Sequence, residues 1–162
     1  IPMVLADTIG ILLIVLGTLA ATSTLWLFHL ALWPEVVEAA GSKFTTSPIK
    51  SFFVGLPCLL VTIFLVGALS NMGKGPNEFA VLVLMSSFLF VASMGVSGFA
   101  AKIGERLDFD TSRKWKPVLF GGLVLEFTFL FPVLGWILVF PLVSITGFGA
   151  SLRAILFNRR PR

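Results

Sequence analysis

The sequence predicts an all-α fold, a polytopic transmembrane helical bundle that forms a single domain over residues 1–162. Composition is the first reason: 57% of the residues are hydrophobic and only 12% are charged, whereas about 25% of the residues in a typical soluble domain are charged. The second reason is that the apolar residues form continuous runs of roughly 20 residues or more, the length with which a helix crosses a bilayer. Four to five such segments fill the chain and leave no stretch for a soluble domain.

The first predicted segment covers residues 8–33, with Asp7 or Thr8 positioned to cap its N-terminus. A helix of this length exceeds the hydrocarbon core of the bilayer and is expected to tilt. Pro34 suits the first turn of a short helix that lies along the membrane interface and ends at Gly41. The chain therefore leaves the membrane after its first crossing without entering a soluble domain.

The second and third segments are predicted to be antiparallel neighbours. Residues 48–71 begin with a proline suited to a first helical turn and contain Pro57, which should kink the helix. A short connection rich in turn-forming residues leads to the third segment, residues 78–103. Small residues recur along this third segment and allow helices to pack backbone to backbone, so we expect it to be the central helix. These packing residues are Ser93, Gly95, Ser97, Gly98 and Ala101.

A late apolar run is too long for one crossing, because as a continuous helix it would extend roughly 54 Å against a hydrocarbon core of about 30 Å. Pro132 lacks an N–H, and Gly135 accepts the backbone angles of a tight reversal, so we expect the break there. The run then forms a hairpin with legs at residues 115–131 and 136–157. The first leg is short enough for a re-entrant hairpin, so the sequence leaves four spans with a re-entrant hairpin and five spans open.

Basic residues predict the orientation in the membrane. With five crossings, or with a re-entrant hairpin, every lysine and arginine except Lys74 falls on one side, and basic residues gather on the cytoplasmic side. The N-terminus is then outside and the C-terminus cytoplasmic, as in a bacterial inner membrane. The net charge of +4 lies in loops and the tail, which favours anionic lipid as a partner over nucleic acid. We expect Trp33, Trp115 and Trp136 in the aromatic belts.

Glu126 is the charged residue of the late apolar run and is expected roughly 15 Å from the cytoplasmic end of its helix. An ionised carboxylate at that depth is costly, so the group should be protonated, paired or next to a water-filled cavity. One interpretation is a proton or cation path. The favoured interpretation is a neutral acid hydrogen-bonded to the first segment, because coupled transport sites generally combine several ionisable groups. The candidate partners are Thr22, Ser23 and Thr24.

His29 is the single histidine and lies among bulky apolar and aromatic residues. A neutral imidazole in such a setting can ligate a haem iron or a chlorophyll magnesium, which is one interpretation of His29. The chain lacks the second axial histidine of a bis-histidine haem. The favoured interpretation of His29 is therefore an interfacial or hydrogen-bonded structural histidine, and we expect that the protein requires no cofactor. Cys58 lacks a neighbouring base and is interpreted as a packing residue. The sequence contains no phosphate-binding glycine loop, catalytic triad or zinc spacing, which argues against an enzyme.

Two stretches, FFVGLPCLLV and the later FPVLGWILVFPLVSITGFGA, resemble the hydrophobic C-terminal region of bacterial membrane proteins described as bactofilin-like or polymer-forming. In that family a proline-valine-leucine-glycine-tryptophan turn similarly precedes an apolar run that ends in a glycine-rich stretch. The resemblance covers the later part of the chain and implies a membrane anchor or scaffold, without catalytic residues. The β-rich domain of such proteins has no counterpart in this sequence.

The favoured function is therefore structural: an accessory subunit or scaffold whose small-residue helix faces contact other membrane subunits. Two alternatives remain open. One is a subunit of a photosynthetic or respiratory complex that binds a chlorophyll-type pigment or a haem through His29. The other is a small transporter or channel centred on Glu126. Frequent phenylalanine also suits bound lipid. Because the chain starts at Ile1 rather than methionine, we expect either a removed segment or a longer native protein.

Overall fold

The computed structural model describes residues 2–71, 75–107, 113–131 and 133–157. Helices make up nearly all of these residues, and none of them forms a strand. The predicted all-α class is confirmed. Four helical stretches are long and apolar enough to cross a membrane: Asp7–Leu32, Pro48–Ser70, Asn77–Arg106 and Leu134–Phe157.

The elements follow one another through short connections. In order they are α1 (Pro2–Leu32), α2 (Pro34–Thr46), α3 (Pro48–Ser70), α4 (Pro76–Arg106), α5 (Trp115–Phe129), the π-helix η1 (Leu134–Val139) and α6 (Phe140–Phe157). Proline stands in the first turn of α2, α3 and α4, where a missing N–H is tolerated because the first N–H groups of a helix have no partner within it. Pro57 lies inside α3, and the helix continues through it.

Two predicted helix ends were wrong. α1 begins at Pro2, so Asp7 and Thr8 lie inside the helix and do not cap it. α2 continues through Gly41 to Thr46. A glycine commonly ends a helix by adopting a positive φ, and the described glycine with a positive φ is Gly75, in the loop before α4. Gly41 is instead buried at a helix crossing, where a Cβ would overlap the backbone of Gly98 on α4.

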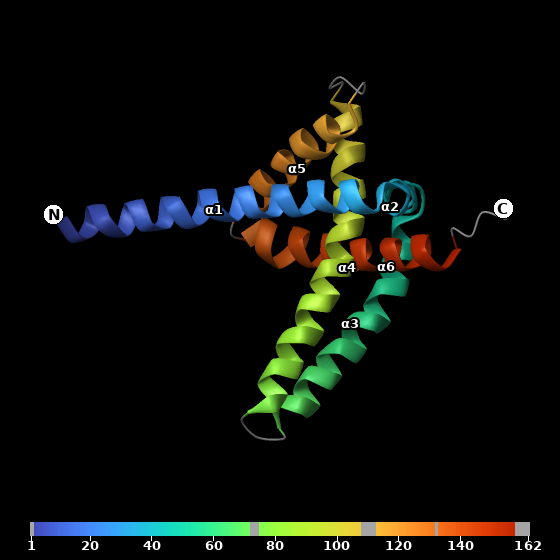
Figure 1. Cartoon of the computed structure of the whole chain (residues 1–162), viewed down its shortest axis with the longest axis horizontal. Coiled ribbons are helices and arrows are strands. Elements are labelled where there is room, and N and C mark those ends of the chain that lie inside the picture. Colours follow the sequence, from blue (N-terminus) through green and yellow to red (C-terminus); the bar gives the residue numbers. More distant parts are fainter. Residues whose placement is uncertain (1, 72–74, 108–112, 132, 158–162) are drawn as a thin grey trace.

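α4 occupies the centre of the molecule, because α1, α2, α3, α5 and α6 all contact it. α3 and α4 run side by side as an antiparallel hairpin, whereas α1 and α6 run across the direction of α4 (Figure 1). Helices that cross contact each other only near the crossing. The N-terminal part of α1 and the far end of the α3–α4 hairpin therefore project from a central body (Figure 1).

Glycine packs the central body at the crossings of its helices. At each crossing a Cβ on the glycine would overlap the facing backbone, so the two chains approach as closely as a residue without a side chain permits. The pairs are Gly41 with Gly98, Gly55 with Ile145, Gly95 with Gly147, Gly104 with Pro117, Gly121 with Ala100, and Gly149 with Ser51. Stacked phenylalanine rings fill the spaces between the crossings, with centroids 4.1 Å apart for Phe44 and Phe99.

α5 and α6 follow each other through a turn that differs from the prediction, and the two predicted hairpin legs diverge from it, because each contacts η1 while they contact each other little. Pro132 lies outside the described residues. Gly135 belongs to η1 and does not supply the left-handed angles of a reversal. Its lack of a side chain matters for packing, because a Cβ there would lie 2.5 Å from the carbonyl oxygen of Thr128 and 2.7 Å from that of Phe129. The return helix thus begins in direct contact with the end of α5.

Candidate functional site

Glu126 lies on the side of α5 that faces α1 and is only 3% exposed. Its Oε1 accepts hydrogen bonds from the Thr22 hydroxyl and from Ser23 Oγ, the latter at 3.0 Å. Ser23 Oγ also lies 3.2 Å from Oε2. Thr24, the third predicted partner, instead donates to the carbonyl oxygen of Ala20 at 2.7 Å within its own helix. The carboxyl group therefore connects α5 to α1 through two hydroxyls.

The surroundings of Glu126 suit a structural acid. It forms no ion pair within the part of the chain that the structure describes. Thr22 Oγ1 lies 2.8 Å from the carbonyl oxygen of Thr18 and carries a single proton. The arrangement thus accommodates a protonated Glu126 that donates to Thr22 while Thr22 donates to its own helix. A proton path would require further ionisable groups next to this carboxyl group.

His29 is fully enclosed, with 0% of the side chain exposed, where α1 crosses α4. Its Nε2 lies 2.6 Å from Ser93 Oγ, and that hydroxyl donates to the carbonyl oxygen of Phe90 at 2.9 Å. Ser93 carries one proton, so a Ser93 hydroxyl that donates to Phe90 accepts from Nε2 of His29. The Nδ1 of His29 has no partner among the described residues.

A haem or chlorophyll ligand would need an open face beside one of the imidazole nitrogens of His29. The Phe90 ring packs edge-on against the imidazole at a centroid distance of 4.6 Å, and the rings of Phe28 and Trp33 lie 6.1 and 6.3 Å away. These rings enclose the imidazole, and His29 presents no exposed face. The geometry therefore favours a structural role for His29 over pigment or haem binding.

The predicted packing residues of α4 face several different neighbours. Gly95 lies against α6 and Gly98 against α2. Ser93 and Ser97 face α1, where Ser97 Oγ donates to the carbonyl oxygen of Trp26 at 2.9 Å. Ala101 lines a cavity. A single run of small residues thus lets α4 contact three other helices.

The three predicted belt tryptophans are exposed, and they stand at the ends of helices. Trp33 lies at the junction of α1 and α2, and Trp115 begins α5. Trp136 lies in η1, at the turn of the C-terminal hairpin. Trp26 differs from these three, because it is buried and lies directly over Gly122 of α5.

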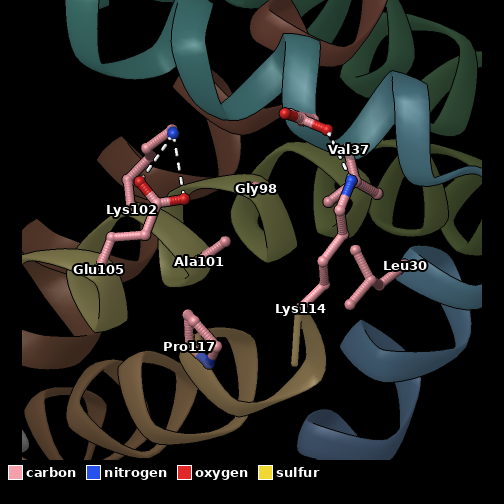
Figure 2. A pocket seen from close by; sticks show the side chains of 9 residues that line it. Leu30, Val37, Gly98, Ala101, Lys102, Glu105, Lys114 and Pro117 are labelled. Atoms are coloured by element: carbon pink, nitrogen blue, oxygen red, sulfur yellow. Dashed lines mark hydrogen bonds and ion pairs between the residues drawn. The ribbon is translucent and has the colours of Figure 1, made fainter. Parts of the chain in front are cut away.

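A cavity of about 190 Å³ lies where α1, α2, α4 and α5 meet, and the sequence did not predict it. Figure 2 shows an ion pair on each side of it: Lys102 Nζ lies 2.8 Å from Glu105, and Lys114 Nζ lies 3.4 Å from Glu38. Each cation has an acidic partner, so the four charges of the lining balance. The rest of the lining is uncharged and consists of Leu30, Val37, Gly98, Ala101 and Pro117.

A second polar cluster joins the C-terminal end of α2 to α3 and α6. Arg153 Nη1 donates to Ser47 Oγ at 2.9 Å and to Ser51 Oγ at 2.8 Å. Lys43 Nζ donates to the carbonyl oxygen of Arg153 at 3.0 Å. Neither cation has an acidic partner in the described part of the chain. Sequence reasoning placed these residues on the basic face but did not bring them together.

Within the described residues, no group of three or more histidine, cysteine, aspartate or glutamate side chains is arranged to hold a metal ion. Comparison of the chain with protein-family models, with curated proteins and with solved structures finds no match. The resemblance to bactofilin-like membrane regions therefore stays a prediction.

Proposed function

We propose that this protein is a non-enzymatic integral membrane subunit that acts as an accessory or scaffold component of a larger membrane assembly. The observation that supports the proposal is a contrast between the buried polar side chains and the exposed apolar side chains. Polar groups buried in the body, such as Glu126, His29 and Ser97, bond to neighbouring helices of the same chain. The projecting helix ends, in contrast, present apolar side chains that the chain itself leaves uncovered.

Two projecting parts, which we call the arms, supply the surface for a partner. The α1 arm comprises residues 7–21, none of which is buried. The α3–α4 arm comprises residues 60–71 and 75–87 and exposes Phe64, at 74%, and Phe79. Lipid covers such surfaces by default. However, a Cβ on Gly10, Gly17 or Gly67 would have no heavy atom within 4 Å, and in the body the same residue type brings helices together.

We further propose that the C-terminal hairpin is re-entrant. α5 has 15 residues, or about 22 Å of helix, which is shorter than a hydrocarbon core of about 30 Å. The described residues of the turn expose apolar side chains, including Phe131, Val133 and Leu134. A tip of this composition is favoured in hydrocarbon over water. Both legs then open toward the basic, cytoplasmic side, and the N-terminus lies outside the bacterial inner membrane.

Site-specific photocross-linking in native membranes tests the scaffold proposal. A photoreactive residue replaces Leu13 in the α1 arm, Phe64 in the α3–α4 arm or, as the control, the exposed Ile155 of α6. We expect the arms to form a discrete protein adduct that Ile155 does not form, and the same partner to accompany the chain in fixed stoichiometry after gentle detergent extraction. A chain that leaves the membrane as a single copy, with lipid adducts alone at both arms, would contradict the proposal.

The two alternative functions are tested separately. If proteoliposomes containing the purified chain carry an ion flux that Glu126→Gln abolishes while the fold survives, a transporter replaces the scaffold. If the purified protein shows a Soret or chlorophyll absorption band that His29→Ala removes, a pigment- or haem-binding subunit replaces it.

A further inference from the structure

We propose that the junction of α2, α3 and α6 binds a phosphate group, and that in the membrane this phosphate belongs to the headgroup of an anionic phospholipid. The inference rests on the membrane location that four apolar helices indicate. It does not depend on the scaffold role, because the site is contained in one chain. Three features carry it: unpaired cations, unused N–H donors and the level of the site relative to the membrane spans.

Arg153 is the centre of the site. Its Nη1 donates to the hydroxyls of Ser47 and Ser51 and, at 3.5 Å, to the carbonyl oxygen of Ser47. Its Nε and Nη2 groups have no hydrogen-bond acceptor in the described part of the chain. The two serines also lie 3.3 Å from the carbonyl oxygen of Lys43, to which their hydroxyls donate. The hydroxyl oxygens are thereby left to accept from Arg153. The serines orient the guanidinium group but carry no charge to neutralise it.

Two lysines add positive charge around Arg153. Lys43 is held at the site by its bond to the Arg153 carbonyl oxygen. Lys50 lies one turn after Ser47 in α3 and therefore faces the same side of that helix. None of the three cations forms an ion pair within the described residues. Arg153 and Lys43 are partly buried, whereas Lys50 is exposed. A partly buried charge without a counterion is unfavourable, so an anion beside Arg153 and Lys43 is stabilised.

The start of α3 adds a weaker attraction for an anion. Ser47, which precedes the helix, makes no side-chain cap. The first N–H groups of a helix point outward and carry partial positive charge. A phosphate oxygen accepts hydrogen bonds both from such groups and from a guanidinium group. The arginine and the lysines select a phosphate, and the helix start supports it.

The position along the spans points to a lipid as the source of the phosphate. Ser47 directly precedes the span Pro48–Ser70, and Arg153 lies in the last turns of the span Leu134–Phe157. Both are therefore at headgroup level. Basic sites between helices at the cytoplasmic face are suited to anionic lipids.

The experiment measures lipid binding to the purified full chain by native mass spectrometry in a mild detergent, with phosphatidylglycerol and phosphatidylcholine as the probes. Arg153→Gln removes the charge and keeps a donor for the serines. Arg113→Gln is the matched control, because it removes an equal charge from an exposed residue that forms no ion pair with the described residues. We expect Arg153→Gln to weaken phosphatidylglycerol binding by at least about fivefold, and neither variant to change phosphatidylcholine binding.

Several results would overturn the proposal. Equal losses in the two variants would show that general attraction to a basic surface accounts for the binding. Displacement of the lipid by millimolar inorganic phosphate would keep the anion site but reject a lipid as its source. If Arg153→Gln does not fold, Lys43→Gln replaces it, since that variant keeps the bonds between Arg153 and the serines, and unchanged phosphatidylglycerol binding in it rejects the site.

Discussion

The central body and the arms contain the same residue types but use them in opposite ways. In the body, glycines such as Gly55 and Gly149 each lie against the backbone of another helix. In the arms, Gly17 and Gly67 face open space. Serines divide similarly, because Ser97 bonds to α1 whereas Ser87 bonds to its own helix. The comparison teaches that a small residue contributes to packing only where two helices actually cross.

The largest expected difference is between two glycines of α3. Gly55→Val would place a side chain on the carbonyl oxygen of Ile145, and because backbone cannot move aside easily we expect a destabilisation of about 3 kcal/mol or loss of the fold. Gly67→Val in the arm is the matched control and should change stability by less than about 0.5 kcal/mol. Unfolding by heat or SDS in detergent measures both. Similar destabilisation in the two variants would remove the distinction between body and arm.

The next effect concerns the bond between α1 and α5. Glu126→Leu removes the carboxyl group that bonds to the Thr22 and Ser23 hydroxyls, and we expect a loss of about 1–3 kcal/mol. Glu126→Gln retains an oxygen acceptor and should lose less than half as much. The same unfolding assay compares the two variants. Equal losses would mean that the carboxyl group itself, and not only its hydrogen bonds, is required.

A smaller effect separates two serines of α4. Ser97→Ala removes the bond to the Trp26 carbonyl oxygen, and hydrogen bonds between membrane helices contribute about 0.6 kcal/mol on average. Ser87→Ala removes only a bond to Val83 within α4 and should be neutral. Midpoints of SDS unfolding resolve this difference. A larger loss for Ser87→Ala would indicate an additional contact for the α3–α4 arm.

The smallest expected effect on stability is in the α3–α4 arm. Phe64 is 74% exposed, so Phe64→Ala should leave unfolding of the purified chain unchanged to within about 0.5 kcal/mol. If a partner helix covers this surface, the same substitution should reduce co-extraction of the partner from native membranes. If the isolated chain loses stability and the partner is still co-extracted, Phe64 contributes to folding and not to partner binding.

Composition and the length of apolar runs were sufficient to predict the fold class, and the prolines marked the starts of α2 and α3. Gly41 and Gly135 were misinterpreted for a physical reason. A glycine that ends a helix and a glycine that admits another helix look alike in sequence, and the difference depends on segments far along the chain. Gly41, for example, packs against Gly98.

The depth of the residues in the membrane and the helix periodicity were sufficient to predict that Thr22 and Ser23 bond to Glu126. Thr22 and Ser23 reach Glu126 because they lie at a matching depth on the facing side of α1. A helix turns by about 100° per residue, so Thr24 points elsewhere and bonds to Ala20. The Arg153 cluster was not predictable in this way, because its partners come from helices about a hundred residues apart and no local pattern links them.

The contact between α1 and α5 also determines the order in which the chain assembles. Thr22 and Glu126 are separated by 104 positions, so the ribosome adds α2, α3 and α4 before the acid that bonds to Thr22 exists. Until α5 is inserted, α1 is held through its C-terminal half alone, where His29 and the Trp26 carbonyl oxygen bond to α4. During that interval the rest of α1 is uncovered and available to insertion factors, and a chain interrupted before α5 lacks the bonds at Thr22 and Ser23.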